Sequence, residues 1–176
     1  MISSTMKPSA TNFIKLASKA VLALYIFTLL WLVLFKLSFD LPSVLLDYQS
    51  RSLNLIPFLG FSRGNGKEII ENFIIFIPFG LLLSVDLKRL SFWRKLAIMF
   101  IVSLAVETLQ FVFAIGTTDI TDVITNTFGG FIGLVLYDVC HKYVDEDKLD
   151  RFIVVAAASV LILLLLLRIF VLRVRY

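Results

Sequence analysis

Long runs of apolar residues, separated by short polar stretches, dominate the pattern along this chain. Each run is long enough to cross the hydrocarbon core of a bilayer, which takes about 17–25 residues in a helix. The pattern therefore predicts an all-α membrane protein, a polytopic bundle of five transmembrane helices. The predicted spans are residues 17–35, 69–85, 96–115, 122–140 and 152–172.

The first span has a second interpretation as a signal peptide, because lysines precede and begin its apolar run. The run is long, however, and the segment Leu37–Asp40 after it is a poor cleavage site. We therefore expect residues 1–16 to be a cytoplasmic N-terminus and the first span to remain as an anchor.

The longest connection, residues 36–68, contains the apolar patch Leu53–Phe61, which is too short to cross a membrane. We expect an outer loop whose apolar patch is interfacial or re-entrant. The second span contains Pro78 and Gly80. Pro78 is expected to kink or break the helix, which is tolerated where neighbouring groups bond the carbonyl that it frees.

The composition supports the membrane class and excludes several functions. The chain is 59% hydrophobic and 17% charged, with mean hydropathy +0.94, which is too apolar for an ordinary soluble domain. The single cysteine, Cys140, excludes an intrachain disulfide, and the single histidine, His141, excludes a zinc site of three histidines within one chain. The net charge of +4 comes without a basic stripe interleaved with aromatics, so no nucleic-acid partner is predicted.

The basic residues predict the orientation of the spans. With the N-terminus inside, ten of the 17 Lys and Arg lie on the cytoplasmic side, four of them in the short segment Asp86–Lys95. The basic tail after the fifth span argues for the opposite side. Either the C-terminus lies outside despite its arginines, or one span is not a full crossing.

Glu107 is the most informative polar residue, because it lies inside an apolar span where a carboxylate costs about 2.5 kcal/mol or more to insert. Ser103, Glu107 and Gln110 are spaced to share one face of a helix. Ionisable residues at that depth usually face a bundle interior and mark functional sites.

Two other spans bring polar residues to the same predicted leaflet. Glu71 and Asn72 lie in the first turn of the second span, and Asp119, Asp122 and Asn126 mark the start of the fourth. The chain therefore predicts one ligand-binding pocket near the outer surface, with no metal site assigned but a divalent cation as one option. Its candidate residues are Ser103, Glu107, Gln110, Asp119, Asp122, Asn126, Glu71 and Asn72.

Glycines continue the polar stripe of the fourth span toward the other leaflet. Gly129, Gly130 and Gly133 let a second backbone approach closely, and together with Pro78 and Gly80 they are the predicted helix-packing positions.

Each polar residue also has a purely structural interpretation. Asp119 or Asp122 would cap the fourth span, and Glu71 would pair with Lys67 one turn earlier. Asn126 would bond a neighbouring helix, and Glu107 would bond Asn126 or pair with Arg63.

Several sequence blocks in a fixed order resemble the VanZ-like family of integral membrane proteins. The blocks are Leu53–Phe58, Glu71-Asn72, Phe76–Gly80, Ser103-x-x-x-Glu107-x-x-Gln110, Asp119–Asp122 and Asn126–Gly130, and they cover about residues 51–137. The resemblance implies a multi-pass protein of the bacterial cytoplasmic membrane that acts at the cell envelope. The family is named for teicoplanin resistance in Gram-positive bacteria. Many relatives carry an arginine where this chain has Gly116-Thr117-Thr118, so Arg51, Arg63 or Lys67 would have to replace it.

The resemblance and the outward pocket together favour one functional hypothesis. We expect a protein that lowers susceptibility to glycopeptide or lipoglycopeptide antibiotics and binds an amphiphile, such as a lipid-linked envelope precursor or the drug itself, at the outer leaflet. One alternative is an intramembrane hydrolase or transferase that uses two carboxylates, and the absence of a nucleophile–base pair counts against it. Another is a proton-coupled transporter or a subunit of a membrane complex, which would require oligomers.

Overall fold

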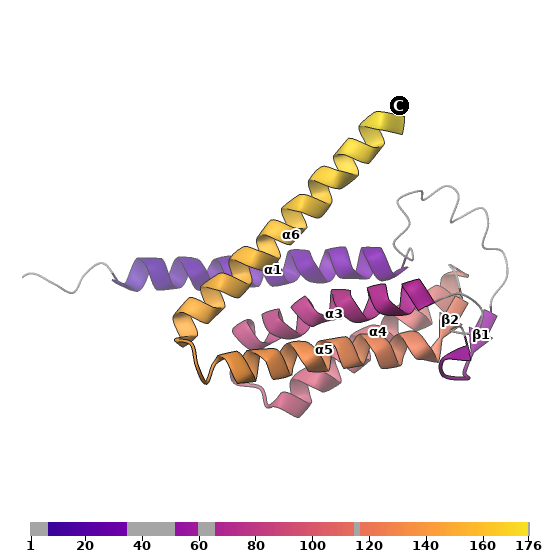
Figure 1. Cartoon of the computed structure of the whole chain (residues 1–176), viewed down its shortest axis with the longest axis horizontal. Coiled ribbons are helices and arrows are strands. Elements are labelled where there is room, and N and C mark those ends of the chain that lie inside the picture. The colour runs from indigo at the N-terminus through magenta and orange to yellow at the C-terminus, as the bar shows by residue number, and fades with distance from the viewer. Residues whose placement is uncertain (1–6, 35–51, 60–65, 115–116, 176) are drawn as a thin grey trace, which may run out of the picture.

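The computed structural model describes residues 7–34, 52–59, 66–114 and 117–175, and these form five helices and two short strands (Figure 1). In chain order they are α1 (Lys7–Leu34), β1 (Ser52–Asn54), α3 (Gly66–Asp86), α4 (Phe92–Phe113), β2 (Thr117–Asp119), α5 (Ile120–Cys140) and α6 (Glu146–Arg175).

The prediction of a helical membrane bundle is confirmed. Within the described residues, five helices are long and apolar enough to span a membrane. The strands were not predicted. They pair in parallel, with Ser52 opposite Thr117 and Asn54 opposite Asp119. Because the pair is only three residues long, the chain remains helical in class.

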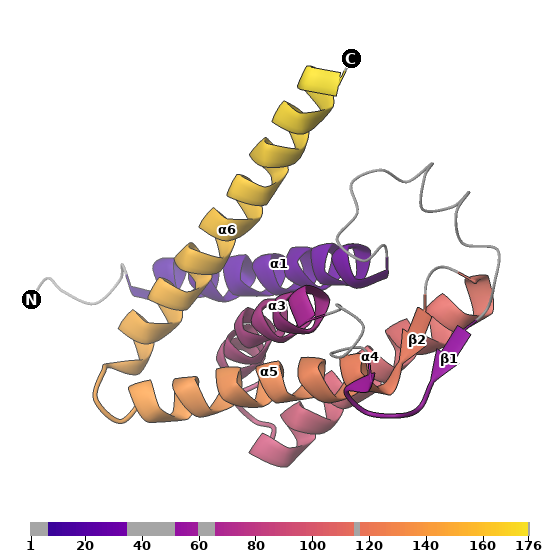
Figure 2. The ribbon, with the colours of Figure 1, turned by 45° about the vertical axis from the view of Figure 1, so that its right-hand side comes forward.

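Helices α3 and α5 form the centre of the bundle. About half of the membrane-spanning part of each is buried, compared with about a quarter in the other three spans. Helix α1 packs on α3, α4 packs on α5, and α6 crosses α1 obliquely before its far half leaves the other helices (Figures 1 and 2). The end of the bundle that carries β1 and β2 is called the strand end, and the opposite end, with the connections 87–91 and 141–145, the loop end.

All five helices begin earlier than their predicted spans, because charged or amphipathic turns precede the apolar runs. Helix α6 starts with the acids Glu146 and Asp147, which suit the positive end of the helix dipole. Helix α4 follows Ser91, which has the extended backbone of an N-cap.

Glycines on both central helices bring α3 and α5 unusually close. A Cβ on Gly133 would lie 2.2 Å from the carbonyl oxygen of Ile77, and one on Gly80 would lie 2.3 Å from that of Gly130. Gly129 faces the carbonyl of Phe73 in the same way, at 2.1 Å. The glycine stripe therefore lies in the contact between the two central helices.

Helix α3 runs unbroken through Pro78, although a kink or break was expected there. Proline removes the donor for the carbonyl of Ile74, four residues earlier. The Tyr25 hydroxyl from α1 donates to the next carbonyl, that of Ile75, at 2.7 Å. A neighbouring helix therefore supplies a donor where the helix is weakened.

At the loop end, Lys88 connects the α3–α4 connection to the start of α6. Its ammonium donates to Glu146 and to Asp150, and Tyr137 of α5 donates to the other oxygen of Asp150 at 2.8 Å. Burial by itself would lower the pKa of Lys88, but its bonds to Asp150 and Glu146 outweigh that effect and raise the pKa above its usual value.

The raised pKa of Lys88 predicts a loss of stability in alkaline solution. A lysine with a higher pKa in the folded state stabilises fully below its unfolded pKa, about 10.4, and this contribution disappears as the pH rises through the folded pKa. We expect Lys88→Met to unfold at a lower temperature than wild type at pH 8 and to lose less stability than wild type above about pH 10. The effect is about 1 kcal/mol or less, because the Lys88 side chain is 41% exposed.

Thermal unfolding in detergent at a series of pH values measures this difference. The exposed Lys142, in the α5–α6 connection, supplies the matched control Lys142→Met. Parallel pH curves for wild type and Lys88→Met would show that the ion pairs do not stabilise the fold.

Candidate functional site

The candidate site lies at the strand end, where α3 and α5 begin and α4 ends (Figure 1). Helix α4 stops at Phe113, and Ala114 follows in the left-handed conformation at φ 54°, a position that glycine usually takes. Its backbone N–H donates to the carbonyls of Gln110 and Phe111. The chain then enters β2 and turns directly into α5.

Glu107 of α4 bonds the chain at the junction of β2 and α5. Its side chain is 2% exposed, and Oε2 accepts a hydrogen bond from the backbone N–H of Asp119 at 2.8 Å. The backbone carbonyl of Glu107 also accepts from the Thr118 hydroxyl at 3.3 Å. The membrane-depth carboxylate is therefore turned toward the protein interior, where it fixes the start of α5.

Asp119 is the N-cap of α5 and also joins the two strands. Oδ1 accepts from the backbone N–H of Thr121 at 2.8 Å, which satisfies a free donor of the first turn. Oδ2 accepts from the Asn54 side chain at 2.9 Å. The capping interpretation is therefore correct for Asp119, and the carboxylate holds β1 as well.

Asn54 is a residue of the site that sequence reasoning did not select. Its Oδ1 accepts from the N–H of Ile56 at 3.2 Å, and two residues on, Phe58 donates to the Thr121 hydroxyl at 3.0 Å. These bonds fix the described segment 52–59 on the start of α5. A lone amide within an apolar patch was the available signal.

The apolar side chains of segment 52–59 point outward from this attachment. Leu55 and Ile56 are 65% and 61% exposed. An exposed apolar tip at one end of a bundle suits contact with the bilayer interface. The expected interfacial or re-entrant role of this patch stays a prediction. Residues 35–51 and 60–65, on either side of segment 52–59, lie outside the described residues.

Ser103 and Asn126 join α4 to α5 deeper in the bundle. Both are fully buried, and the Asn126 amide nitrogen donates to the Ser103 hydroxyl at 2.9 Å. Asn126 therefore bonds a neighbouring helix, as its structural interpretation required. Its other polar atom, Oδ1, is buried and accepts no hydrogen bond from the described residues.

Gln110 joins α4 to the end of α1. Its amide nitrogen donates to the carbonyl of Val33 at 2.9 Å, and so satisfies a carbonyl in the last turn of α1. Gln110 is 1% exposed, and its buried Oε1 likewise accepts no hydrogen bond within the described part of the chain. A buried acceptor left without a donor costs about 1–3 kcal/mol. Asn126 and Gln110 therefore each carry one buried oxygen that could accept a further hydrogen bond.

The remaining predicted residues divide into two groups. Asp122, in the first turn of α5, and Asn72, in α3, are both buried at the strand end. Glu71 is not brought into the cluster, because it lies partly exposed and pairs with Lys67 at 3.4 Å. Arg51 and Arg63, the suggested substitutes for the family arginine, lie outside the described residues.

A pocket of about 230 Å³ opens between β1, α4 and the start of α5. Its wall is mostly apolar, and its acidic groups are Glu107 and Asp119. Such a lining suits an amphiphile better than a fully hydrated ion. The lining residues are Leu53, Leu55, Leu104, Glu107, Thr108, Phe111, Thr118, Asp119, Ile120 and Val123.

The polar groups of this end are carboxylates, amides and hydroxyls. In the part of the chain that the structure describes, no three His, Cys, Asp or Glu side chains lie close enough to hold a metal ion. The carboxylates of Glu107 and Asp119 both accept hydrogen bonds from protein donors, and both residues line the apolar pocket.

A sequence model of the VanZ/LLP1 family matches residues 22–141. The chain belongs to this family. Protein VanZ of Enterococcus faecium is 55% identical to it over 140 residues, which is 80% of this chain and 85% of that protein. No solved structure matches the chain.

The VanZ/LLP1 match is wider than the blocks at residues 51–137 that carry the resemblance. It begins within α1 and ends just after α5, so it includes most of the first span and every residue of the strand-end cluster. The α1 carbonyl that Gln110 binds lies within the matched region too. Helix α6 lies beyond it.

Proposed function

We propose that this VanZ-family protein binds the polar part of an envelope amphiphile at the strand end, and that this binding lowers susceptibility to teicoplanin-type lipoglycopeptides. The observation that carries the proposal is the pair of buried amide oxygens of Asn126 and Gln110, which accept no hydrogen bond from the described residues. The apolar pocket lined by Glu107 and Asp119 supports it. Amide groups would bond the polar part, and the pocket between β1 and α4 would take an apolar portion.

The basic residues support an outward-facing strand end. Lys88, Arg89, Arg94 and Lys95 all lie in or next to the short α3–α4 connection at the opposite end. Short basic loops face the cytoplasm in most membrane proteins. The strand end would then face the outer leaflet of the bacterial cytoplasmic membrane, where lipid-linked envelope precursors and lipoglycopeptide drugs are both accessible.

The charge at Glu107 would serve the site by holding it in shape. Its carboxylate bonds the peptide N–H at Asp119, and charged acceptors form stronger hydrogen bonds than neutral ones. Substitution by glutamine keeps the size of the side chain but removes the charge. The start of α5, which carries Asp122 and Asn126, would then be held less firmly.

Drug susceptibility of a Gram-positive host that lacks a VanZ-family protein tests the proposal. Expression of the wild type is expected to raise the inhibitory concentration of teicoplanin and related lipoglycopeptides. Glu107→Gln is expected to return it toward the value of the empty vector at equal membrane abundance. Glu68→Gln, in the first turn of α3, is the matched control because it removes the same charge from the same end of the bundle. Unchanged susceptibility to all of these drugs on wild-type expression would refute the proposed role.

A further inference from the structure

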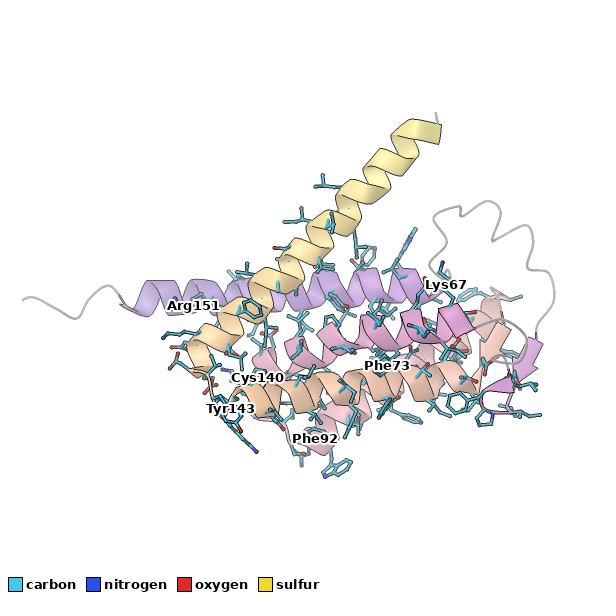
Figure 3. The ribbon with its side chains drawn as sticks, viewed as in Figure 1. Lys67, Phe73, Phe92, Cys140, Tyr143 and Arg151 are labelled. Carbon is cyan, nitrogen blue, oxygen red and sulfur yellow. The ribbon has the colours of Figure 1, made fainter. Side chains whose placement is uncertain are left out.

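A second cavity lies at the loop end, opposite the proposed amphiphile site. Its volume is about 700 Å³, and it is bounded by residues 14–19 of α1, the end of α3 with the α3–α4 connection, and the start of α6. Figure 3 shows Arg151 at this end of the molecule and Lys67 at the other. Charged side chains from all three elements line it, and the strand-end function makes no use of them.

Most of the acids in this cavity are already engaged within the protein. Asp86 accepts a hydrogen bond from Ser18 at 2.6 Å, and Lys19 places a positive charge near the same carboxylate. Glu146 and Asp150 both bind Lys88. Lys19 and Lys88 therefore offset two of these three negative charges, which would repel an anion.

Three other cations around the cavity do not pair with its acids. They are Lys15 from α1, Arg89 from the α3–α4 connection and Arg151 from α6, and all three are exposed. No ion pair joins them to any of the described residues. Asp147 lies one turn before Arg151 on α6, but such an exposed pair offsets the arginine only weakly. Positive charge from three separate elements therefore surrounds one cavity.

The position of the cavity relative to the membrane spans identifies the kind of anion. The spans begin or end at Ile14, Asp86 and Glu146, which all line it. Lipid headgroups lie at this depth. The apolar side chains of Val85, Leu87 and others in the lining give the cavity an apolar part beside its charges. A free phosphate ion gains nothing from contact with an apolar wall, whereas the first carbons of an acyl chain are stabilised by it.

We propose that the loop-end cavity binds the phosphate of an anionic phospholipid, with Lys15, Arg89 and Arg151 as its cationic ligands. The two arginines provide paired N–H donors that match phosphate oxygens, and the lysine adds a mobile charge. The same lipid would add to the bonds of Ser18 with Asp86 and of Lys88 with the acids of α6, which already join these elements. This inference is independent of the function proposed for the strand end.

Thermal unfolding of the full-length protein in a neutral detergent tests the site. Phosphatidylglycerol is expected to raise the unfolding temperature, and phosphatidylcholine to raise it less. The triple variant Lys15→Gln/Arg89→Gln/Arg151→Gln is expected to need at least about tenfold more phosphatidylglycerol for the same shift, a factor that corresponds to about 1.4 kcal/mol. Without added lipid it should unfold near the wild-type temperature, because the three side chains make no ion pair within the described residues.

The control variant Arg94→Gln/Lys142→Gln/Lys148→Gln removes the same charge from the same end, and none of its positions lines the cavity. If both triple variants lost stabilisation by phosphatidylglycerol equally, the lipid would be attracted to the charged surface in general and not bound in this cavity. Glycerol phosphate, added as a soluble probe, distinguishes the source of the phosphate. If it stabilised the wild type as well as phosphatidylglycerol does, the lipid assignment would be wrong.

Discussion

Gly133→Leu is expected to prevent α3 and α5 from packing and so to abolish folded protein. Even the single methyl of Gly133→Ala would lie 2.2 Å from the Ile77 carbonyl oxygen and 3.0 Å from the Cα of Gly80. Both contacts are backbone atoms, which cannot rotate away as a side chain would. The two central helices must therefore separate, and the buried side chains between them lose contact.

The expected cost of Gly133→Ala is about 1–3 kcal/mol, typical of an overpacked core. The 2.2 Å contact is with backbone, so we expect the upper end of this range. The better helix propensity of alanine opposes it by about 1 kcal/mol, which leaves a net loss of about 2 kcal/mol. The control is Ala105→Leu, which adds more volume at an exposed position of α4. Size-exclusion chromatography and thermal unfolding in detergent measure both. A Gly133→Ala protein as stable as Ala105→Leu would contradict the close approach of α3 and α5.

The helices and their inward faces were predictable because both rest on short periods in the sequence. Apolar runs identify the spans, and i, i+4, i+7 spacing placed Ser103, Glu107 and Gln110 on one face. All three are buried in the structure. The same reasoning placed the glycines of α5 on packing faces: Gly129 and Gly133 lie against α3, and Gly130 lies against Met99 of α4.

The partners of these residues were not predictable from one sequence. The bond between Asn54 and Asp119 joins residues 65 positions apart, and strands of three residues leave no alternation to read. The bond from Gln110 to Val33 depends on which helix lies beside α4, which the pattern of a single helix does not contain. The roles of Asp119 and Glu71 could not be decided for a different reason. Each residue could either bond its own helix or belong to the ligand-binding site. Geometry shows the local contact for both, a cap and an ion pair.

The hydrogen bonds at the strand end divide its residues into those that hold the site in shape and those that we expect to contact a ligand. Glu107 accepts from the backbone of Asp119, and Asp119 accepts from the side chain of Asn54. These bonds fix the shape of the site. Asn126 and Gln110 each keep one buried oxygen with no donor in the described residues. The first group is expected to act through position, and the second through contact with the bound molecule.

The double variant Ser103→Ala/Asn126→Leu is expected to remain folded and to lose resistance completely. Ser103→Ala alone removes the acceptor for the buried Asn126 amide, which costs about 1–3 kcal/mol. Replacing both partners with apolar side chains removes the unsatisfied group as well, so the double variant should recover most of that loss. A purely structural pair would then leave drug susceptibility at the wild-type value, whereas an amide that contacts the ligand would not.

The matched control for this experiment is Tyr25→Phe. It removes another buried interhelical hydrogen bond, worth about 1 kcal/mol, at a position outside the strand-end cluster. Tyr25→Phe is expected to lose some stability and keep resistance, and the double variant is expected to do the reverse. Unfolding temperature in detergent and inhibitory concentration of teicoplanin, measured at equal membrane abundance, separate the two effects. Wild-type resistance in Ser103→Ala/Asn126→Leu would show that Asn126 only joins α4 to α5, because the bound molecule would then make no use of its amide.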